Sequence, residues 1–163
     1  MSTSKEDLYA DFKDWSPDVQ SILQLMQVCD IWALFDHLPA STYCKQRICM
    51  SGDAAHASTP HQGAGAAMAI EDAYVLSSLL GDVTSVIDFE RAFKAFDAAR
   101  RERTLKLVKT SRQSGMMFDF ELVDIGDDLG RIRENLDTRF HWIWHENLLN
   151  EVSKVKRWKE IYN

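Results

Sequence analysis

The residues best suited to chemistry lie in one stretch, ICMSGDAAHASTPHQGAGAAMAIEDAYVLSSLL, which runs from residue 48 to residue 80. The chain has only 7 Gly and 3 Pro, yet this window holds four of them: Gly52, Pro60, Gly63 and Gly65. Glycine allows a backbone to approach a ligand closely. A helix predicted to begin near Ala64 would direct free N–H groups and its positive dipole end at the same loop. These features predict a binding loop for a ligand with a negatively polarised edge.

Three polar side chains in the window add chemical possibilities. Asp53 follows a strand end, and its carboxylate accepts hydrogen bonds of the kind that sugar-type hydroxyls donate. His56 and His61 flank the loop and are candidate catalytic residues, because a histidine in a dry pocket can act as a general acid or base. The other interpretation is a glycine-rich turn in which Asp53 is only a local cap.

Two common phosphate-binding motifs are excluded. The segment GAGAAM, residues 63–68, nearly matches the dinucleotide fingerprint G-x-G-x-x-G/A. Met68, however, occupies the third small position, and the predicted strand ends near Ser51, too far upstream for a tight strand-turn-helix. A P-loop is excluded because no Gly-Lys-Ser/Thr follows the glycines.

The residue types that bind metals do not form a site. His141 and His145 in HWIWHE share a helix face, but no Glu follows His141 and no third ligand is evident, so we predict no metal. The cysteines are odd in number and lack a CxxC spacing: Cys29, Cys44 and Cys49. They are predicted to be reduced thiols of a cytoplasmic protein.

The composition excludes several classes of partner. The 163 residues, 45% hydrophobic and 27% charged, suit one globular domain. A net charge of −6 argues against nucleic acid, since phosphate binding needs clustered positive charge. The clustered basic residues alternate with apolar positions and are predicted to form the exposed face of a helix: Arg100, Arg101, Arg103, Lys106 and Lys109. No apolar run reaches the roughly 18 residues of a membrane span, so no membrane partner is expected.

Strand signals precede the loop. DIWALFDHLP alternates and stops at a proline, which predicts a strand over Ile31–Leu38, and Arg47–Ser51 is predicted to be a second, adjacent strand. Upstream, a capping-box spacing at Thr3 predicts a short helix, and Ser16 followed by a proline predicts the start of another.

Helix signals follow the loop. Ala66–Leu80 is predicted to be a helix that ends at Gly81, with a buried stripe made of Met68, Ala69, Ala73, Leu76 and Leu80. Asp88 is expected to cap a second helix that extends to about Ser114. The remainder is predicted to be mainly helical, with breaks near residues 126–130 and near residue 147. The predicted fold class is mostly α with a small β component (α+β).

Three stretches together carry a family resemblance. RICMSGDAAHASTPHQGAGAAMAIEDAYVLSSLL, the preceding WALFDHLPASTYCKQR and the following DFERAFKAFDAARRERTLKLVKTSR resemble the second flavin-binding motif and its flanks in class A FAD-dependent aromatic monooxygenases. The fungal salicylate hydroxylase-like proteins are the most similar group. The resemblance implies the C-terminal part of a PHBH-like (p-hydroxybenzoate hydroxylase-like) flavin monooxygenase fold, with about two strands and long helices.

The resemblance also implies roles for single residues. Asp53 would hold a ribityl hydroxyl of FAD, Gly52 would provide room for it, and Pro60 would lie beside the reactive side of the flavin ring. Backbone N–H groups would face the pyrimidine end of the ring, supplied by Gln62, Gly63, Ala64 and Gly65. In the family the positions of His56 and His61 are mainly structural. The sequence departs from the pattern at Gln46, where a Gly usually precedes the Arg, and at Ser51, where the strand usually has an apolar residue.

The larger departure is the missing first half of the family's fold. No second glycine cluster offers the G-x-G-x-x-G that binds the ADP part of FAD, so we expect one truncated domain over residues 1–163. Its parts are a strand-loop-helix flavin-ring motif at 30–80 and a helical region at 88–163. The expected partners are a homo-oligomer or a separate N-terminal half, and a small aromatic or polyketide-like substrate.

Three kinds of function remain open on the sequence alone. The first is the flavin-ring half of a hydroxylase that uses FAD, NAD(P)H and O₂. The second is a flavin-free enzyme that uses the same pocket for acid/base cyclisation or isomerisation. The third is a non-catalytic oligomerising fragment.

Overall fold

The computed structural model describes residues 3–157 and divides the chain into two compact units, with the boundary between Leu34 and Phe35. The first unit contains two short helices, α1 (Lys5–Asp11) and α2 (Pro17–Gln24). The predicted start of α2 is confirmed, because the Ser16 side chain caps it and Pro17 is its first residue. The capping position of α1 differs by one residue from the prediction, since the Ser4 hydroxyl, rather than that of Thr3, accepts a hydrogen bond from Asp7 N at 3.0 Å.

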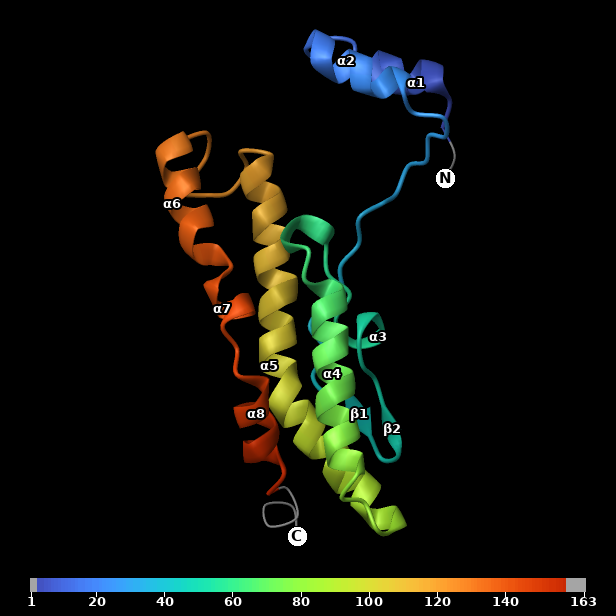
Figure 1. Ribbon diagram of the computed structural model, residues 1–163, viewed down its shortest axis with the longest axis vertical. Coiled ribbons are helices and arrows are strands. Elements are labelled where there is room, and N and C mark those ends of the chain that lie inside the picture. The colour runs from blue at the N-terminus through green and yellow to red at the C-terminus, as the bar shows by residue number, and fades with distance from the viewer. Residues whose placement is uncertain (1–2, 158–163) are drawn as a thin grey trace. The chain divides into compact units, whose positions relative to one another are not determined.

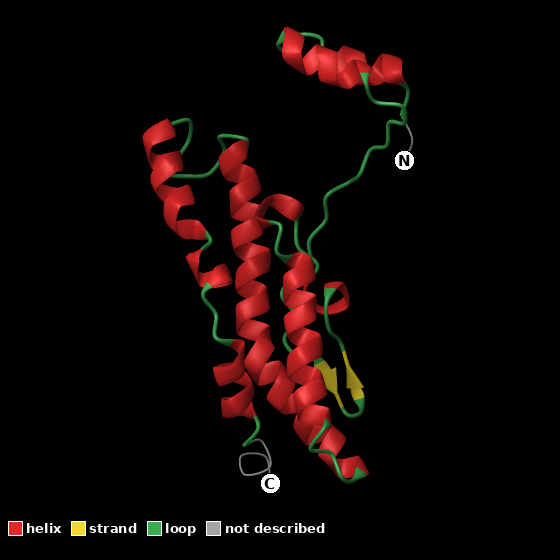
Figure 2. Cartoon of the chain, in the orientation of Figure 1, coloured by secondary structure: helices red, strands yellow, loops and turns green. Residues whose placement is uncertain are grey.

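The second unit consists of helices and one small hairpin (Figures 1 and 2). Its elements are β1 (Cys44–Lys45), β2 (Ile48–Cys49), α3 (Asp53–His56), the 3₁₀ turn η1 (Pro60–Gln62), α4 (Gly65–Leu80), α5 (Val86–Phe118), α6 (Leu129–Arg139), α7 (His141–Trp144) and α8 (Leu148–Val155). The predicted α+β class with few strands is confirmed. The predicted breaks are also found, because α5 and α6 are separated by residues 119–128 and Asn147 caps α8.

The prediction of a strand over Ile31–Leu38 is wrong. A strand needs a hydrogen-bonded neighbour, and within residues 3–157 the only ladder joins β1 to β2 in an antiparallel pair. Residues 31–38 are irregular, and one backbone bond, from His37 N to Ala57 O at 2.8 Å, links this segment to α3. The apolar alternation is real, but Trp32 and Phe35 are 81% and 80% exposed. The predicted second strand, Arg47–Ser51, shortens to β2.

Helices α4 and α5 lie side by side and form the centre of the second unit (Figure 1). Ser85 and Asp88 form a capping box at the start of α5, so Asp88 contributes to the cap while Ser85 is the N-cap residue. Gly81 ends α4 as predicted. Local signals therefore mark the end of α4 and the start of α5. Helix α4 begins at Gly65 without a side-chain cap, and α5 extends to Phe118, past the predicted end near Ser114.

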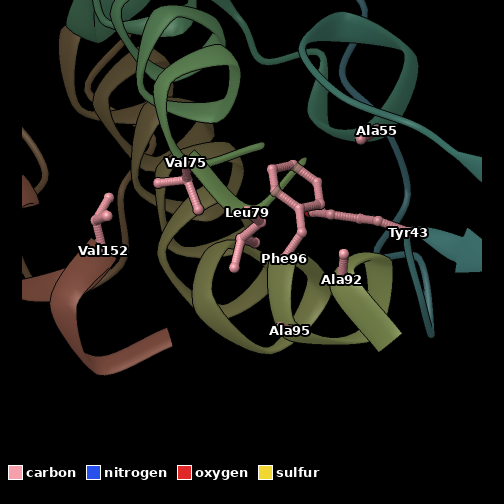
Figure 3. Close-up of a cluster of buried hydrophobic side chains, with 8 residues drawn as sticks. All are labelled: Tyr43, Ala55, Val75, Leu79, Ala92, Ala95, Phe96 and Val152. Carbon is pink, nitrogen blue, oxygen red and sulfur yellow. The ribbon is translucent and has the colours of Figure 1, made fainter. Parts of the chain in front are cut away.

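A cluster of buried side chains joins α4 and α5 to the hairpin and to α8 (Figure 3). Its members are Tyr43, Ala55, Val75, Leu79, Ala92, Ala95, Phe96 and Val152. The buried stripe of α4 differs from the predicted one, because only Met68 of the predicted residues is fully buried. The observed stripe is Met68, Asp72, Val75 and Leu79, so the helix is rotated and an aspartate occupies a core position.

No helix within residues 3–157 combines the length and apolar character that crossing a membrane requires. Nor does this part of the chain bring three or more His, Cys, Asp or Glu side chains together as metal ligands.

Candidate functional site

The hairpin leads directly into the candidate loop. Met50 N donates to Tyr43 O at 2.8 Å, which extends the pairing of β1 and β2 by one residue pair. The chain then turns at Gly52, whose φ of 57° and ψ of −145° suit glycine and few other residues. A Cβ at Gly52 would lie 3.3 Å from Ala69 Cβ, so this glycine also lets the loop approach α4. Asp53 follows as the first residue of α3, with its side chain exposed.

The loop continues through η1 to the start of α4. Pro60 begins η1, and Gly63 ends it in the left-handed conformation with φ 61°. No side chain caps the N-terminus of α4, where Ala64 is the N-cap residue. The first N–H groups of a helix have no partner within the helix, so those of α4 are available to a ligand. Gly65 has an ordinary φ, and a Cβ there would meet only Ser58 Oγ, at 3.5 Å, so internal packing does not require a glycine.

Helix α5 holds the outer part of the loop in place. Thr110 Oγ1 donates to Gln62 Oε1 at 2.7 Å, and Ser111 Oγ donates to Thr59 O at 2.6 Å. The ring of His61 lies against Gly115, where a Cβ would stand only 2.7 Å from the ring. The loop is therefore fixed by a helix that is about 50 residues away in sequence, from Gln62 to Thr110.

Asp72 organises the inner part of the loop from a fully buried position on α4. Its Oδ2 accepts hydrogen bonds from His56 Nε2 at 2.6 Å and from Gly52 N at 2.9 Å. Its Oδ1 accepts from Arg100 Nε at 2.8 Å. Burial alone would raise the pKa of Asp72, but these hydrogen bonds outweigh it and hold the pKa below its ordinary value. Asp72 thus remains a carboxylate that fixes the turn before Asp53.

The prediction that Arg100 belongs to an exposed basic face is wrong. Arg100 is 1% exposed, because α5 turns this position toward α4, where Asp72 and Glu71 lie. Lys106 and Lys109 are exposed as predicted. Arg103 is also largely buried and forms a two-bond pair with Glu71, at 2.9 and 2.8 Å.

Arg103 extends the ionic network to the C-terminal segment. Its guanidinium donates to the carbonyl oxygens of Trp142 and Ile143, at 2.8 and 3.2 Å. Burial would raise the pKa of Glu71, but the two arginines outweigh this effect and lower it. The sequence signal for this network is the adjacent acidic pair Glu71 and Asp72 in a helix whose neighbouring residues are mostly apolar.

The candidate residues differ in where the structure places them. Exposed positions that a ligand can reach are occupied by Asp53, Pro60 and Gly63, with Gly52 and Gly65 half-buried beside them. Gln62 and Ala64 are buried. His56 is 1% exposed and bonded to Asp72, and half-buried His61 packs on Gly115, so neither ring forms the open surface of the loop. A hollow of about 400 Å³ between α5 and the segment around Trp142 is lined by none of these loop residues.

Comparison with known proteins assigns this arrangement to a family. The model of the FAD binding domain family matches residues 18–111, which is more than half of the chain. The 6-methylsalicylate 1-monooxygenase of Aspergillus terreus is 40% identical over 88% of this chain, and a salicylate hydroxylase of Pseudomonas putida is 32% identical over 94% of it.

A solved structure shows the same fold. A salicylate hydroxylase substrate complex superposes on 96% of this chain with a TM-score of 0.87 and 31% sequence identity. The chain covers 32% of the Aspergillus terreus monooxygenase, 36% of the Pseudomonas putida hydroxylase and 38% of the chain in the solved structure. It therefore spans about a third of the length of the proteins it matches.

The family match and the solved fold agree with the loop geometry. FAD is the cofactor that the family assigns, and the glycine loop, Asp53 and the uncapped start of α4 are compatible with it. The chain belongs to the FAD binding domain family and has the α+β fold of the C-terminal part of a PHBH-like flavin monooxygenase.

Proposed function

We propose that this chain forms the flavin-ring side of the FAD site in an aromatic-ring monooxygenase. The overall reaction is hydroxylation of a phenolic or related aromatic substrate with NAD(P)H and O₂. When bound, FAD supplies the redox chemistry of that reaction. The residues of this chain bind the cofactor, orient it and shape the surface on which the substrate lies.

The observation that carries this proposal is the uncapped N-terminus of α4 beside two glycines of the loop. The N–H groups of the first turn and the helix dipole favour a ligand edge that carries negative charge. A Cβ at Gly65 would have only an ordinary contact, with Ser58 Oγ at 3.5 Å, so packing within the protein does not explain this glycine. The space beside it is open to a ligand. A flavin ring gains negative charge at one end when it is reduced, and this site suits that end.

Asp53 supplies the second contact. Its side chain is exposed at the start of α3, and a carboxylate there can accept a hydrogen bond from a ribityl hydroxyl. Its position depends on Gly52, whose N–H is held by the buried carboxylate of Asp72. We assign His56 a positioning role in this network and His61 a packing role on α5, rather than proton transfer to a ligand.

The remainder of the FAD site belongs to a part of the fold outside these 163 residues. Ile70 and Tyr74 lie four residues apart on one face of α4 and are 71% and 40% exposed. Phe35 and Leu38 are also exposed. Exposed apolar side chains that gather on one face of a helix indicate a site of contact with another protein surface. We propose that these exposed apolar side chains contact the part of the flavin monooxygenase fold that binds the ADP end of FAD. That part would lie on the same polypeptide or on a second one.

Flavin titration tests the proposal directly. We expect the flavin fluorescence of FAD to be quenched when the protein binds it. The affinity should be weaker than in full-length relatives, because the ADP end of FAD has fewer contacts here. Asp53→Ala should weaken binding by roughly 1.5–3 kcal/mol, the range for hydrogen bonds that involve a charged group. Gly65→Val should abolish it, because a β-branched side chain would fill the space beside the helix start.

The matched control is His141→Ala. His141 is exposed on α7, outside the loop, so this variant should bind flavin like the wild type. Equal flavin binding by wild type and Gly65→Val would contradict the proposal. In that case the flavin-free use of the same loop would be the better hypothesis, and a screen of phenolic substrates without flavin would test it.

A further inference from the structure

The hairpin before the loop places two cysteines directly opposite each other. In the antiparallel register of β1 and β2, Cys44 pairs with Cys49 and Lys45 pairs with Ile48. Both cysteines are free thiols and both are half-buried. Side chains of directly opposed residues in an antiparallel pair lie on the same face of the sheet. The two thiols are therefore neighbours although four residues separate them in sequence.

The hydrogen-bond pattern shows which kind of pair they form. Met50 N donates to Tyr43 O at 2.8 Å, and these two residues are opposed in the same register, so they are a hydrogen-bonded pair. Hydrogen-bonded and non-hydrogen-bonded pairs alternate along an antiparallel ladder. Cys44 and Cys49 are therefore a non-hydrogen-bonded pair, the type in which opposed Cα atoms are closest, at about 4.5 Å.

This spacing is compatible with a disulfide. Disulfide-bonded residues have Cα atoms about 4.4–6.8 Å apart and Cβ atoms about 3.5–4.5 Å apart. Opposed Cβ atoms in such a pair are about 4.5–5.5 Å apart, so a small movement of two short strands closes the remaining gap. The hairpin ends in a two-residue turn at Gln46 and Arg47, and both strands are only two residues long, so this movement disturbs little else.

The two thiols have different surroundings. Burial, together with a smaller effect of the nearby Cys44, raises the pKa of Cys49 to about 12. Cys49 packs against the core cluster, whereas the Cys44 sulfur lies 3.7 Å from the Thr42 hydroxyl at the edge of the hairpin. In the reduced hairpin Cys49 is therefore a protonated thiol.

We propose that Cys44 and Cys49 form a reversible oxidation site that a peroxide converts into a cross-strand disulfide. Cys44 reacts first: its sulfur is oxidised to a sulfenic acid, and the peroxide is reduced to water. The Cys49 sulfur then attacks the Cys44 sulfur, loses its proton and displaces hydroxide, so the second product is also water. Two thiols and one hydrogen peroxide thus give one disulfide and two waters. A dithiol reductant reverses the step.

The site has a structural consequence for the loop. Cys49 is three residues before Gly52, so the disulfide would fix the strand that leads into the turn at Gly52 and Asp53. The reduced hairpin has a ladder of only two residues in each strand. This inference does not depend on the proposed function, because the register alone brings the thiols together.

Peptide mapping of the wild-type protein tests the inference. Trypsin cuts after Lys45 and Arg47, which separates Cys44 from Cys49, and a protease that cuts before Asp36 separates Cys29 from Cys44. After treatment with hydrogen peroxide and alkylation of remaining thiols, we expect the peptides of Cys44 and Cys49 to stay joined, with a mass two hydrogens below their sum. Free thiols should fall from the 3 present in the chain to one.

Two variants supply the controls. Cys29→Ser should form the same link, since Cys29 lies in the first unit, outside the hairpin. Cys49→Ser should form no link and should leave Cys44 open to further oxidation to a sulfinic acid. Separate, fully alkylated peptides of Cys44 and Cys49 after oxidation would overturn the inference. A link between the Cys44 peptides of two molecules, with a yield that rises with protein concentration, would overturn it as well.

Discussion

Replacing Asp72 by Asn tests whether the buried network holds the fold and the loop together. Asp72 is fully buried and accepts hydrogen bonds from Arg100, His56 and Gly52. Asparagine has the same shape but presents an NH₂ group where one carboxylate oxygen was, so at least one donor faces another donor. Arg100 then loses a charge partner while remaining 1% exposed.

The expected cost follows from what Arg100 retains. Removing one partner of a buried ion pair costs about 3–5 kcal/mol, because the other charge stays buried without compensation. Arg100 keeps Glu71 at 2.8 Å, so we expect the lower end, about 3 kcal/mol. With a urea m-value of roughly 1–3 kcal/mol/M, the unfolding midpoint should fall by about 1–3 M.

Urea unfolding followed by circular dichroism measures this cost, and Glu151→Gln is the matched control. Glu151 pairs with Lys154 at 2.7 Å, but the lysine is mostly exposed, so its loss should cost less than about 1 kcal/mol. If Asp72→Asn shifts the midpoint no more than Glu151→Gln does, Asp72 does not stabilise the fold as we infer.

The same variant should change the response to acid. The folded pKa of Asp72 lies below its ordinary value of 3.8, so its ionised form favours the folded state. This contribution is complete above that value and is lost as the pH falls through the folded pKa. The difference in stability between wild type and Asp72→Asn should therefore be largest near neutral pH and shrink below about pH 4. A difference that grows on acidification would contradict the assigned charge state.

Two glycine-related predictions follow from backbone conformation. Gln46 has φ 52° at the first central position of the hairpin turn, where glycine is preferred, so its backbone is strained. Gln46→Gly should therefore raise the free energy of unfolding in urea by about 0.5–1 kcal/mol. A loss of stability would show that the Gln46 backbone is not strained. Gly115→Ala should destabilise by roughly 1–3 kcal/mol, because its Cβ would stand 2.7 Å from the His61 ring. Gly81→Ala is the control: its Cβ would have only ordinary contacts at 3.6 Å, so thermal unfolding should show it neutral or slightly stabilised.

The candidate loop could be located from the sequence because its signals are local. The cluster of Gly52, Pro60, Gly63 and Gly65 depends on backbone conformations that neighbouring residues set, and the structure shows positive φ at Gly52 and Gly63. The departure at Gln46, noted as a missing glycine, likewise corresponds to a positive φ. Helix boundaries at Ser16 and Gly81 follow from capping and are equally local.

The strand at Ile31–Leu38 was mispredicted for the opposite reason. An alternating apolar pattern shows that a segment can pair, but pairing needs a second strand, and the described chain provides none for it. The pattern and the observed irregular backbone are consistent once the absence of that neighbour is considered.

The sequence by itself determined the family, the α-rich class and the position of the loop, because these depend on motif order and on interactions between residues a few positions apart. Only the tertiary structure decided which charged side chains are buried and with which partners. Asp72 and Arg100 are 28 residues apart, and each looks like a solvated helix residue until α4 and α5 pack together. Burial makes an unpaired charge too costly, so the fold places these charges in contact, and the pairing fixes Gly52 and the loop behind it.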